Sequence, residues 1–210
     1  MRCNLGSGFR LMRRFDDAVQ QYEQALDLFG RCGWRQGVGK VLGNLASTHN
    51  ATGNNEQAIA VGKQACALFS ELDDKYGEAL SLSNLGRAYS SFGQYDQAME
   101  TLREALEAFE SIGDRRGVAR TEGNIGQAFG RMGRHDDAIP VLLAAIRTFE
   151  EIADPHEQAY NLADLAGSYL ALGQREKARA IARQAADIHA SLGEDWLVAG
   201  LQKRFPGLMP

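Results

Sequence analysis

The sequence has little of what membrane, secreted and disulfide-bonded proteins require. Among its 210 residues no apolar run approaches the roughly 18 residues of a membrane span, and the N-terminus lacks the apolar block of a signal peptide. The three cysteines, Cys3, Cys32 and Cys66, form no CxxC pair, and their odd number argues against a disulfide framework. We therefore expect a cytoplasmic protein with free thiols and without a membrane partner.

Proline and an excess of positive charge are also scarce. The 23 basic and 27 acidic residues leave a net charge of -4, without the basic field typical of nucleic-acid-binding proteins. There are only 4 prolines, and 44% of the residues are hydrophobic, as in ordinary globular proteins. Arginine supplies 18 of the 23 basic residues, a bias associated with GC-rich bacterial genomes. We expect a bacterial globular protein that does not bind nucleic acid.

Motifs of catalysis and metal binding are missing as well. The four histidines include no i, i+4 pair, and no cysteine lies at ligand spacing from them. The sequence has neither a GxxxxGK[ST] loop nor a GxSxG turn. Acidic pairs such as Asp16-Asp17 lie where a helix is expected to begin, and the helix dipole favours acidic residues there. We therefore expect no enzymatic activity, no metal and no cofactor.

What the sequence has in abundance is self-similarity with a period of 40 residues. One set of equivalent positions, which we call the asparagine column, comprises Asn4, Asn44, Asn84, Asn124 and Asp164. An aromatic column comprises Phe9, His49, Tyr89, Phe129 and Tyr169. Arg13, Gly53, Gly93, Gly133 and Gly173 form a third column, and two alanine columns begin at Ala18 and Ala25. Five repeats are therefore present.

Each repeat is expected to contain two helices. In the third repeat, Leu82, Leu85 and Tyr89 recur at helical steps, Gly93 fits a left-handed C-cap, and a second apolar stripe begins at Ala98. We predict first helices near 35–52, 75–92, 115–132 and 155–172. Second helices are predicted near 15–31, 55–71, 95–112, 135–152 and 175–192, with no sheet.

Small residues indicate how these helices pack. Gly86 and Ala98 are expected to face each other within one repeat, where only small side chains permit close approach. Ala105 is expected to contact the next repeat. A single helix pair cannot bury its apolar stripe, so neighbouring repeats are expected to stack into a continuous core. His49 is interpreted as a packed member of the aromatic column, Cys66 as half-buried and inert, and His135 as a solvated turn residue.

The pattern of Leu85-Gly86, Tyr89, Gly93, Ala98 and Ala105 resembles the tetratricopeptide repeat (TPR). The 40-residue period resembles the longer variety of kinesin light chains and spindle-orientation scaffolds, and helical arrays of bacterial regulators. The resemblance implies an all-α, right-handed superhelical solenoid of antiparallel helix pairs, with five repeats and a C-terminal capping helix. We expect a single array over 1–210. Its repeats lie near 1–33, 34–73, 74–113, 114–153 and 154–193, with the cap at 194–205.

The first predicted helix is short, which leaves two interpretations: a natural start, or an array cut from a longer protein. In either case an open N-terminal edge is expected to favour self-association.

The resemblance also implies a binding face, because first helices of such arrays line the concave side. Asparagine amides can donate to and accept from a peptide main chain, and arginines match carboxylates. The backbone-binding role of this asparagine in related repeats is carried over to Asn44, Asn84 and Asn124, but not to Asp164. The candidate site residues are Lys40, Asn44, Asn84, Arg87, Arg120, Asn124, Gln127 and Arg131.

Two other interpretations of these residues stay open. They form an ordinary solvated face, or the asparagines bond between neighbouring first helices. The functional hypothesis is an interaction scaffold for a peptide or helix of a partner protein, with acidic or carboxylate character. The alternative is a regulatory sensor array of a larger signalling protein, an NTPase or a transcriptional regulator.

Overall fold

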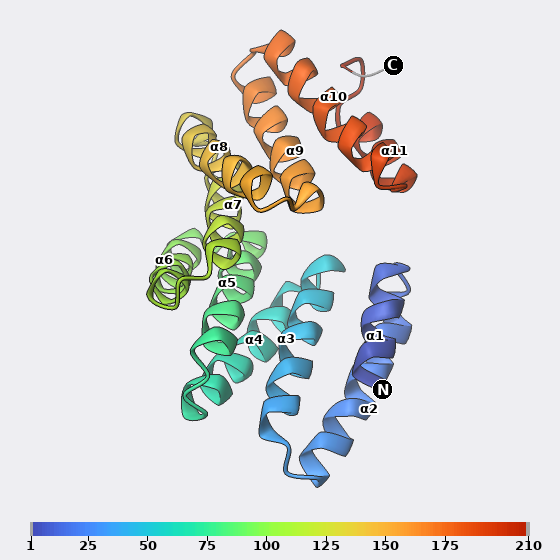
Figure 1. Ribbon diagram of the computed structural model, residues 1–210, viewed down its shortest axis with the longest axis vertical. Helices are drawn as coiled ribbons and strands as arrows, with labels where there is room; N and C mark the ends of the chain where they lie inside the picture. Colours follow the sequence, from blue (N-terminus) through green and yellow to red (C-terminus); the bar gives the residue numbers. More distant parts are fainter. Residues whose placement is uncertain (1, 209–210) are drawn as a thin grey trace. The chain divides into compact units, whose positions relative to one another are not determined.

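The computed structural model describes residues 2–208, which form eleven α-helices and no strand (Figure 1). The chain divides into two compact units, Met1–Gly113 and Asp114–Pro210, each a stack of antiparallel helices. The first unit contains α1 (Arg2–Leu11), α2 (Phe15–Arg31), α3 (Arg35–Ala51), α4 (Asn55–Glu71), α5 (Lys75–Phe92) and α6 (Tyr95–Ser111). The second contains α7 (Arg115–Arg131), α8 (His135–Glu151), α9 (Pro155–Ala171), α10 (Arg175–Ser191) and α11 (Asp195–Arg204).

The predicted helices agree with the observed ones to within one residue at each end, and the all-helical TPR-like fold is confirmed. The odd-numbered helices are the first helices of the repeats, and α11 takes the same place after α10. Across residues 2–208, no helix combines the length and apolarity that a membrane crossing requires.

Helix ends follow the repeat because glycine recurs where the chain must turn. Gly93 is the C-cap of α5 with φ of +84°, a left-handed conformation that costs glycine little. Gly53, Gly133 and Gly173 adopt the same conformation, and Arg13 takes it in the first repeat with φ of +57°. At the starts of first helices, Asp74, Asp114 and Asp154 accept hydrogen bonds from main-chain N–H groups of the first turn.

Within each unit the helices pack through the two alanine columns. Ala18, Ala58 and Ala98 in the first unit are fully buried, as are Ala138 and Ala178 in the second. The predicted approach of Gly86 to Ala98 is confirmed. A Cβ atom at Gly86 would lie 3.3 Å from the Ala98 carbonyl oxygen and 2.6 Å from Cγ of Leu102. The second alanine column is buried too, and Ala25 packs with Val41 of the following repeat.

The two ends of the array differ in how they are covered. Leu45, Leu85 and Leu165 follow the asparagine column and are buried, whereas Leu5 at the same position of α1 is 50% exposed. In the second unit α11 is well anchored, because Leu201, Phe205 and Leu208 join the core cluster of α8, α9 and α10. Self-association through the exposed α1 edge stays a prediction.

A pair of glycine substitutions in the first unit tests this packing. Gly86→Ala is expected to lower the free energy of unfolding by about 1–3 kcal/mol, because the new methyl group overlaps Leu102. Gly43→Ala, on the neighbouring first helix α3, meets no atom within 4 Å and is expected to stabilise by about 0.5–1 kcal/mol. Urea denaturation of both variants, followed by circular dichroism, measures the difference. Equal effects of the same sign would contradict the packing described.

Candidate functional site

In the first unit, neighbouring first helices are joined by side chains on their polar faces. Nδ2 of Asn44 on α3 donates to Sγ of Cys3 on α1, at 3.5 Å. Nη2 of Arg87 on α5 donates to Oγ of Ser47 on α3, at 3.3 Å. The interpretation that asparagines of the column bond between neighbouring first helices therefore holds for Asn44, whose amide connects α3 to α1.

Two other predicted residues of the first unit are more open to a ligand. Lys40 on α3 is exposed. Asn84 on α5 is half-buried, and its amide makes no hydrogen bond with the residues that the structure describes. This face thus offers an ammonium group and an amide, next to the Arg87 guanidinium that already contacts Ser47.

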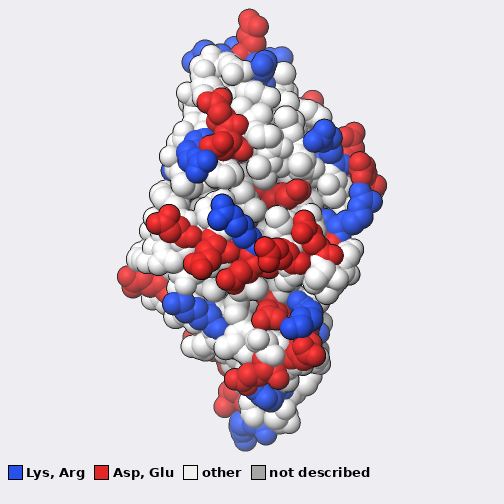
Figure 2. Space-filling view, turned by 90° about the vertical axis from the view of Figure 1, so that its left-hand side faces the viewer, with Lys and Arg blue, Asp and Glu red and all other residues white. Residues whose placement is uncertain are grey.

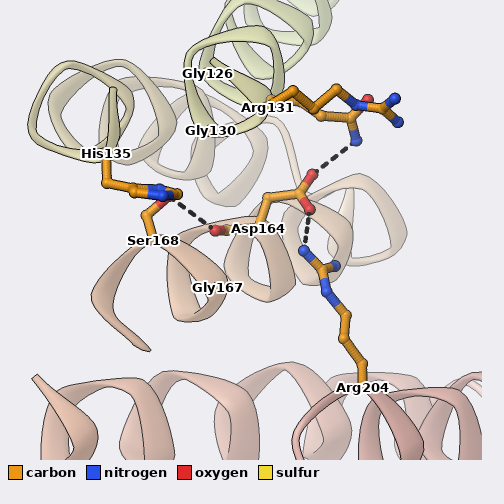
Figure 3. Close-up of a pocket in the computed structure, with 9 residues that line it drawn as sticks. Gly126, Gly130, Arg131, His135, Asp164, Gly167, Ser168 and Arg204 are labelled. Atoms are coloured by element: carbon orange, nitrogen blue, oxygen red, sulfur yellow. Dashed lines mark hydrogen bonds and ion pairs between the residues drawn. The ribbon is translucent and has the colours of Figure 1, made fainter. Parts of the chain in front are cut away.

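In the second unit the polar face is organised around Asp164, the acidic member of the asparagine column. Nε2 of Gln127 on α7 donates to Oδ2 of Asp164 on α9, at 3.1 Å. Nη2 of Arg204 on α11 donates to Oδ1 of the same carboxylate, at 2.8 Å. Figure 3 shows the Arg204 side chain extending toward the Asp164 carboxylate. Three successive first helices are therefore linked through one carboxylate.

A cavity of about 350 Å³ lies on this face. Its lining residues come from α7, α9 and α11 and from the start of α8: Gly126, Gln127, Gly130, Arg131, His135, Asp164, Gly167, Ser168 and Arg204. Glycines at positions 130 and 167 have no side chain to fill the space, as Figure 3 shows. Arg131 is exposed at its edge, and Oγ of Ser168 donates to the main-chain oxygen of Asp164 at 3.2 Å. The cavity thus combines cationic, hydroxyl and amide groups with one carboxylate.

The predicted site residues of this unit are only partly brought together. Gln127 and Arg131 line the cavity, whereas Arg120 and Asn124 are half-buried on α7 and do not. Each unit therefore has its own polar face, Lys40, Asn44, Asn84 and Arg87 in the first and Arg120, Asn124, Gln127 and Arg131 in the second.

Among the ionisable lining residues, sequence reasoning did not select His135 and Arg204, and it gave Asp164 no binding role. The expectation of a solvated His135 at a turn holds only in part, because this first residue of α8 is half-buried and its Nδ1 atom is buried. Arg204 could have been found from the period, since it lies forty residues after Asp164. The contact between Arg204 and Asp164 had no sequence signal of its own.

A second polar cluster fixes the turn before α11. Glu194 precedes α11, and each of its two carboxylate oxygens lies close to a histidine. Nδ1 of the buried His189 lies 2.7 Å from Oε2, and Nε2 of His156 lies 3.1 Å from Oε1. The Tyr160 ring packs edge-on against both imidazoles. No group of His, Cys, Asp and Glu side chains in the described part of the chain has an arrangement that could hold a metal ion.

His49 occupies the aromatic column of the first unit, as expected, but it does so at an energetic cost. Its Nδ1 atom is buried and has no hydrogen-bond partner among residues 2–208. Desolvation by burial lowers the pKa of His49, and the nearby Glu23 carboxylate opposes this shift. The folded protein therefore favours the neutral imidazole.

The Cys66 thiol is half-buried in α4, as predicted. Burial, aided by the negative charge of Glu78, raises the pKa of Cys66 to about 12. The thiolate is the reactive form of cysteine, so this side chain is held unreactive near neutral pH.

Acidic side chains gather on a different surface from the candidate site. Figure 2 shows a band of Asp and Glu over α6, a second helix of the first unit. Its exposed acidic residues are Asp96, Glu100, Glu104, Glu107 and Glu110. The negative net charge of the chain is thus concentrated partly on a second helix, while the candidate cations lie on first helices.

Comparisons with known proteins agree with this architecture. A family model described as tetratricopeptide repeat matches residues 37–111 and 117–191. The comparison with curated protein sequences gives no significant match.

Three solved structures show the same fold. A Rap protein complexed with competence and sporulation factor has 14% identity and a TM-score of 0.86, over 96% of this chain and 56% of that chain. A Podosopora anserina protein described as a kinesin light chain with nearly identical TPR-like repeats has 19% identity and a TM-score of 0.63, over 91% and 94%. A signal transduction ATPase (STAND) with a tetratricopeptide repeat sensor, from Pyrococcus horikoshii, has 14% identity and a TM-score of 0.69, over 96% and 31%.

The lowered pKa of His49 makes stability depend on pH. Below about pH 6.5 the unfolded chain binds a proton that folded His49 takes up less readily, so this residue's effect becomes more destabilising as pH falls. His49→Phe, which restores the aromatic residue found at Phe9 and Phe129, is expected to remove this dependence. The free energies of unfolding of wild type and variant should therefore diverge between about pH 7.5 and pH 5.5, with the variant more stable at the lower pH. A difference that does not change with pH would contradict the assignment.

Proposed function

The chain belongs to the tetratricopeptide-repeat family, and we propose that it is an interaction scaffold that holds a peptide or helical segment of a partner protein. The partner would lie against the polar faces of the first helices. The observation that carries the proposal is the cavity of the second unit, where Gln127 of α7 and Arg204 of α11 both bond to Asp164 of α9. No chemical step is assigned to the chain, and we place its action in the cytoplasm, on protein rather than nucleic acid or membrane.

The chemistry of these faces suits an extended peptide. Asn84 and Asn124 carry amides that can donate to and accept from a peptide main chain. Gln127 and Ser168 add further polar groups at the cavity, and the glycines beside them leave the space open. A peptide main chain has alternating donors and acceptors, so a face with both kinds of group can satisfy it on binding.

The charges favour a ligand with acidic or carboxylate character. Lys40 and Arg87 supply cations on the first unit, and Arg120 and Arg131 supply them on the second. Guanidinium groups match carboxylates in shape and hydrogen-bonding geometry. The acidic residues exposed on α6 lie on a second helix (Figure 2), whereas Lys40 and Arg87 lie on first helices of the same unit.

A regulatory sensor array is the second candidate function. It is favoured by the similarity to a Rap protein in complex with competence and sporulation factor and to the repeat sensor of a STAND ATPase. The chain spans 56% of the first protein and 31% of the second, so it corresponds to one part of each. In that case the same faces would bind a signal and pass its effect to another domain.

Reversing one arginine on each polar face tests the scaffold. The double variant Arg87→Glu, Arg120→Glu is expected to weaken retention of the native partner by at least about tenfold, because a charge-assisted contact is replaced by repulsion. A pull-down from the source cell, with partners identified by mass spectrometry, measures retention, and circular dichroism measures helicity.

A matched control carries the same change of net charge on second helices. Arg103 on α6 and Arg147 on α8 are exposed, one in each unit, so Arg103→Glu, Arg147→Glu should retain the partner. If the variant Arg87→Glu, Arg120→Glu retains the partner as well as wild type does and its helicity is unchanged, the proposal that the partner binds on the first-helix faces is wrong.

A further inference from the structure

The C-terminal helix continues the 40-residue register beyond the fifth repeat. Arg204 lies forty residues after Asp164, and Phe205 lies forty residues after Leu165. Phe205 is buried, as Leu165 is, so α11 packs with the same side toward the core as a first helix does. Arg204 therefore extends the asparagine column by one position and lies on the same face as Asp164.

The contact between Arg204 and Asp164 is accommodated by a glycine. A Cβ atom at Gly167 would lie 3.2 Å from Nη2 of Arg204, and this guanidinium is the only neighbour within 4 Å that it would meet in the described part of the chain. Gly167 thus leaves the space through which Arg204 reaches Asp164, one turn away on α9. The side chain of Arg204 stays 47% exposed and that of Asp164 is 20% exposed, so the pair lies at the cavity wall.

Arg204 sets the balance of positive and negative groups in the cavity lining, because it offsets the negative charge of Asp164. Both oxygens of Asp164 already accept a hydrogen bond, one from Gln127 and one from Arg204. Besides His135, the lining residues with ionisable side chains are Arg131, Arg204 and Asp164, two cations and one anion. Without Arg204 the lining would carry one cation and one anion, and one oxygen of Asp164 would be open to a positively charged ligand group.

We propose that Arg204 is a specificity-determining residue, which neutralises Asp164 and makes this cavity accept a carboxylate rather than an ammonium or guanidinium group. The inference rests on the proposed peptide-binding function and names the chemistry of one of its sites. The five N–H donors of a guanidinium exceed what Asp164 uses, so Arg204 has donors left for a second carboxylate. The carboxylate would come from a peptide C-terminus or from an Asp or Glu side chain.

The test uses four short probes and the whole chain. The first three are acetyl-triglycine with a free C-terminus, the same peptide with a C-terminal amide, and acetyl-Gly-Asp-Gly-amide, which distinguishes a terminal from a side-chain carboxylate. Amide shifts of Gly130, Gly167 and Ser168 in a ¹⁵N-labelled sample report binding at the cavity. A fourth probe, acetyl-Gly-Lys-Gly-amide, reports preference for a cation.

The variants separate the effect of a charge inside the cavity from the effect of the net charge of the protein. Arg204→Gln is expected to weaken binding of the carboxylate probe by about tenfold, the effect of losing one charge-assisted hydrogen bond, and to improve binding of the lysine probe. Asp164→Asn should strengthen carboxylate binding, since it removes the only anion among the lining residues of the cavity. Lys203→Gln removes the same charge from the exposed neighbour outside the cavity and should behave as wild type. Unchanged amide shifts of Leu201 and Leu208, which are buried in the same core cluster, would show that α11 stays docked.

Several results would overturn the inference. The first is an Arg204→Gln variant that keeps the carboxylate preference while α11 stays docked. The second is a loss of carboxylate-probe binding in Lys203→Gln equal to that in Arg204→Gln. The third is a wild-type protein whose cavity amides do not shift when it is titrated with either of the two carboxylate probes. If Arg204→Gln undocks α11, Arg204→Lys becomes the deciding variant: it keeps the charge and should retain the carboxylate preference, and loss of that preference would overturn the inference. These outcomes leave the scaffold function standing if the reversal at Arg87 and Arg120 still releases the partner, so the two proposals fail independently.

Discussion

Close approach between helix backbones at small residues is the constraint on which the rest of this structure depends. Ala18 and its equivalents are fully buried, and glycine at position 86 allows Leu102 to fill the space that a methyl group would occupy. Because these contacts recur every forty residues, the first helices within one unit pack through equivalent positions. This packing brings equivalent polar positions of successive first helices onto one face within each unit, and the proposed binding surface lies on that face.

The same constraint places these polar side chains close enough to bond with one another. Asn44 contacts Cys3 and Arg87 contacts Ser47 in the first unit, while Gln127 reaches Asp164 in the second. The asparagine column is therefore not a uniform row of ligand-binding amides. Some members connect neighbouring helices, and others, such as Asn84, keep an amide that a ligand can use.

The last helix shows how a cap and a site can be the same element. Apolar residues of α11 bury the end of the second unit's core, and Glu194 before it is held by His156 and His189. That anchoring fixes the direction of α11 and hence the position of Arg204 beside Asp164. The helix α11, which covers the apolar end of the second unit, therefore also supplies the Arg204 guanidinium to the cavity.

The sequence by itself determined the helices, their ends and the repeat, because these follow from local rules of periodicity, glycine at left-handed caps and aspartate at N-caps. It also identified which residues lie on the polar faces, since helical spacing fixes a residue's side of the helix. Only the tertiary structure decided which of these residues meet. Arg204 and Asp164 are forty residues apart, and their contact depends on the stacking of α11, on space left at Gly167 and on side-chain conformations. The half-burial of His135 has the same origin, because the burial of its Nδ1 atom comes from packing around the start of α8, which no local pattern specifies.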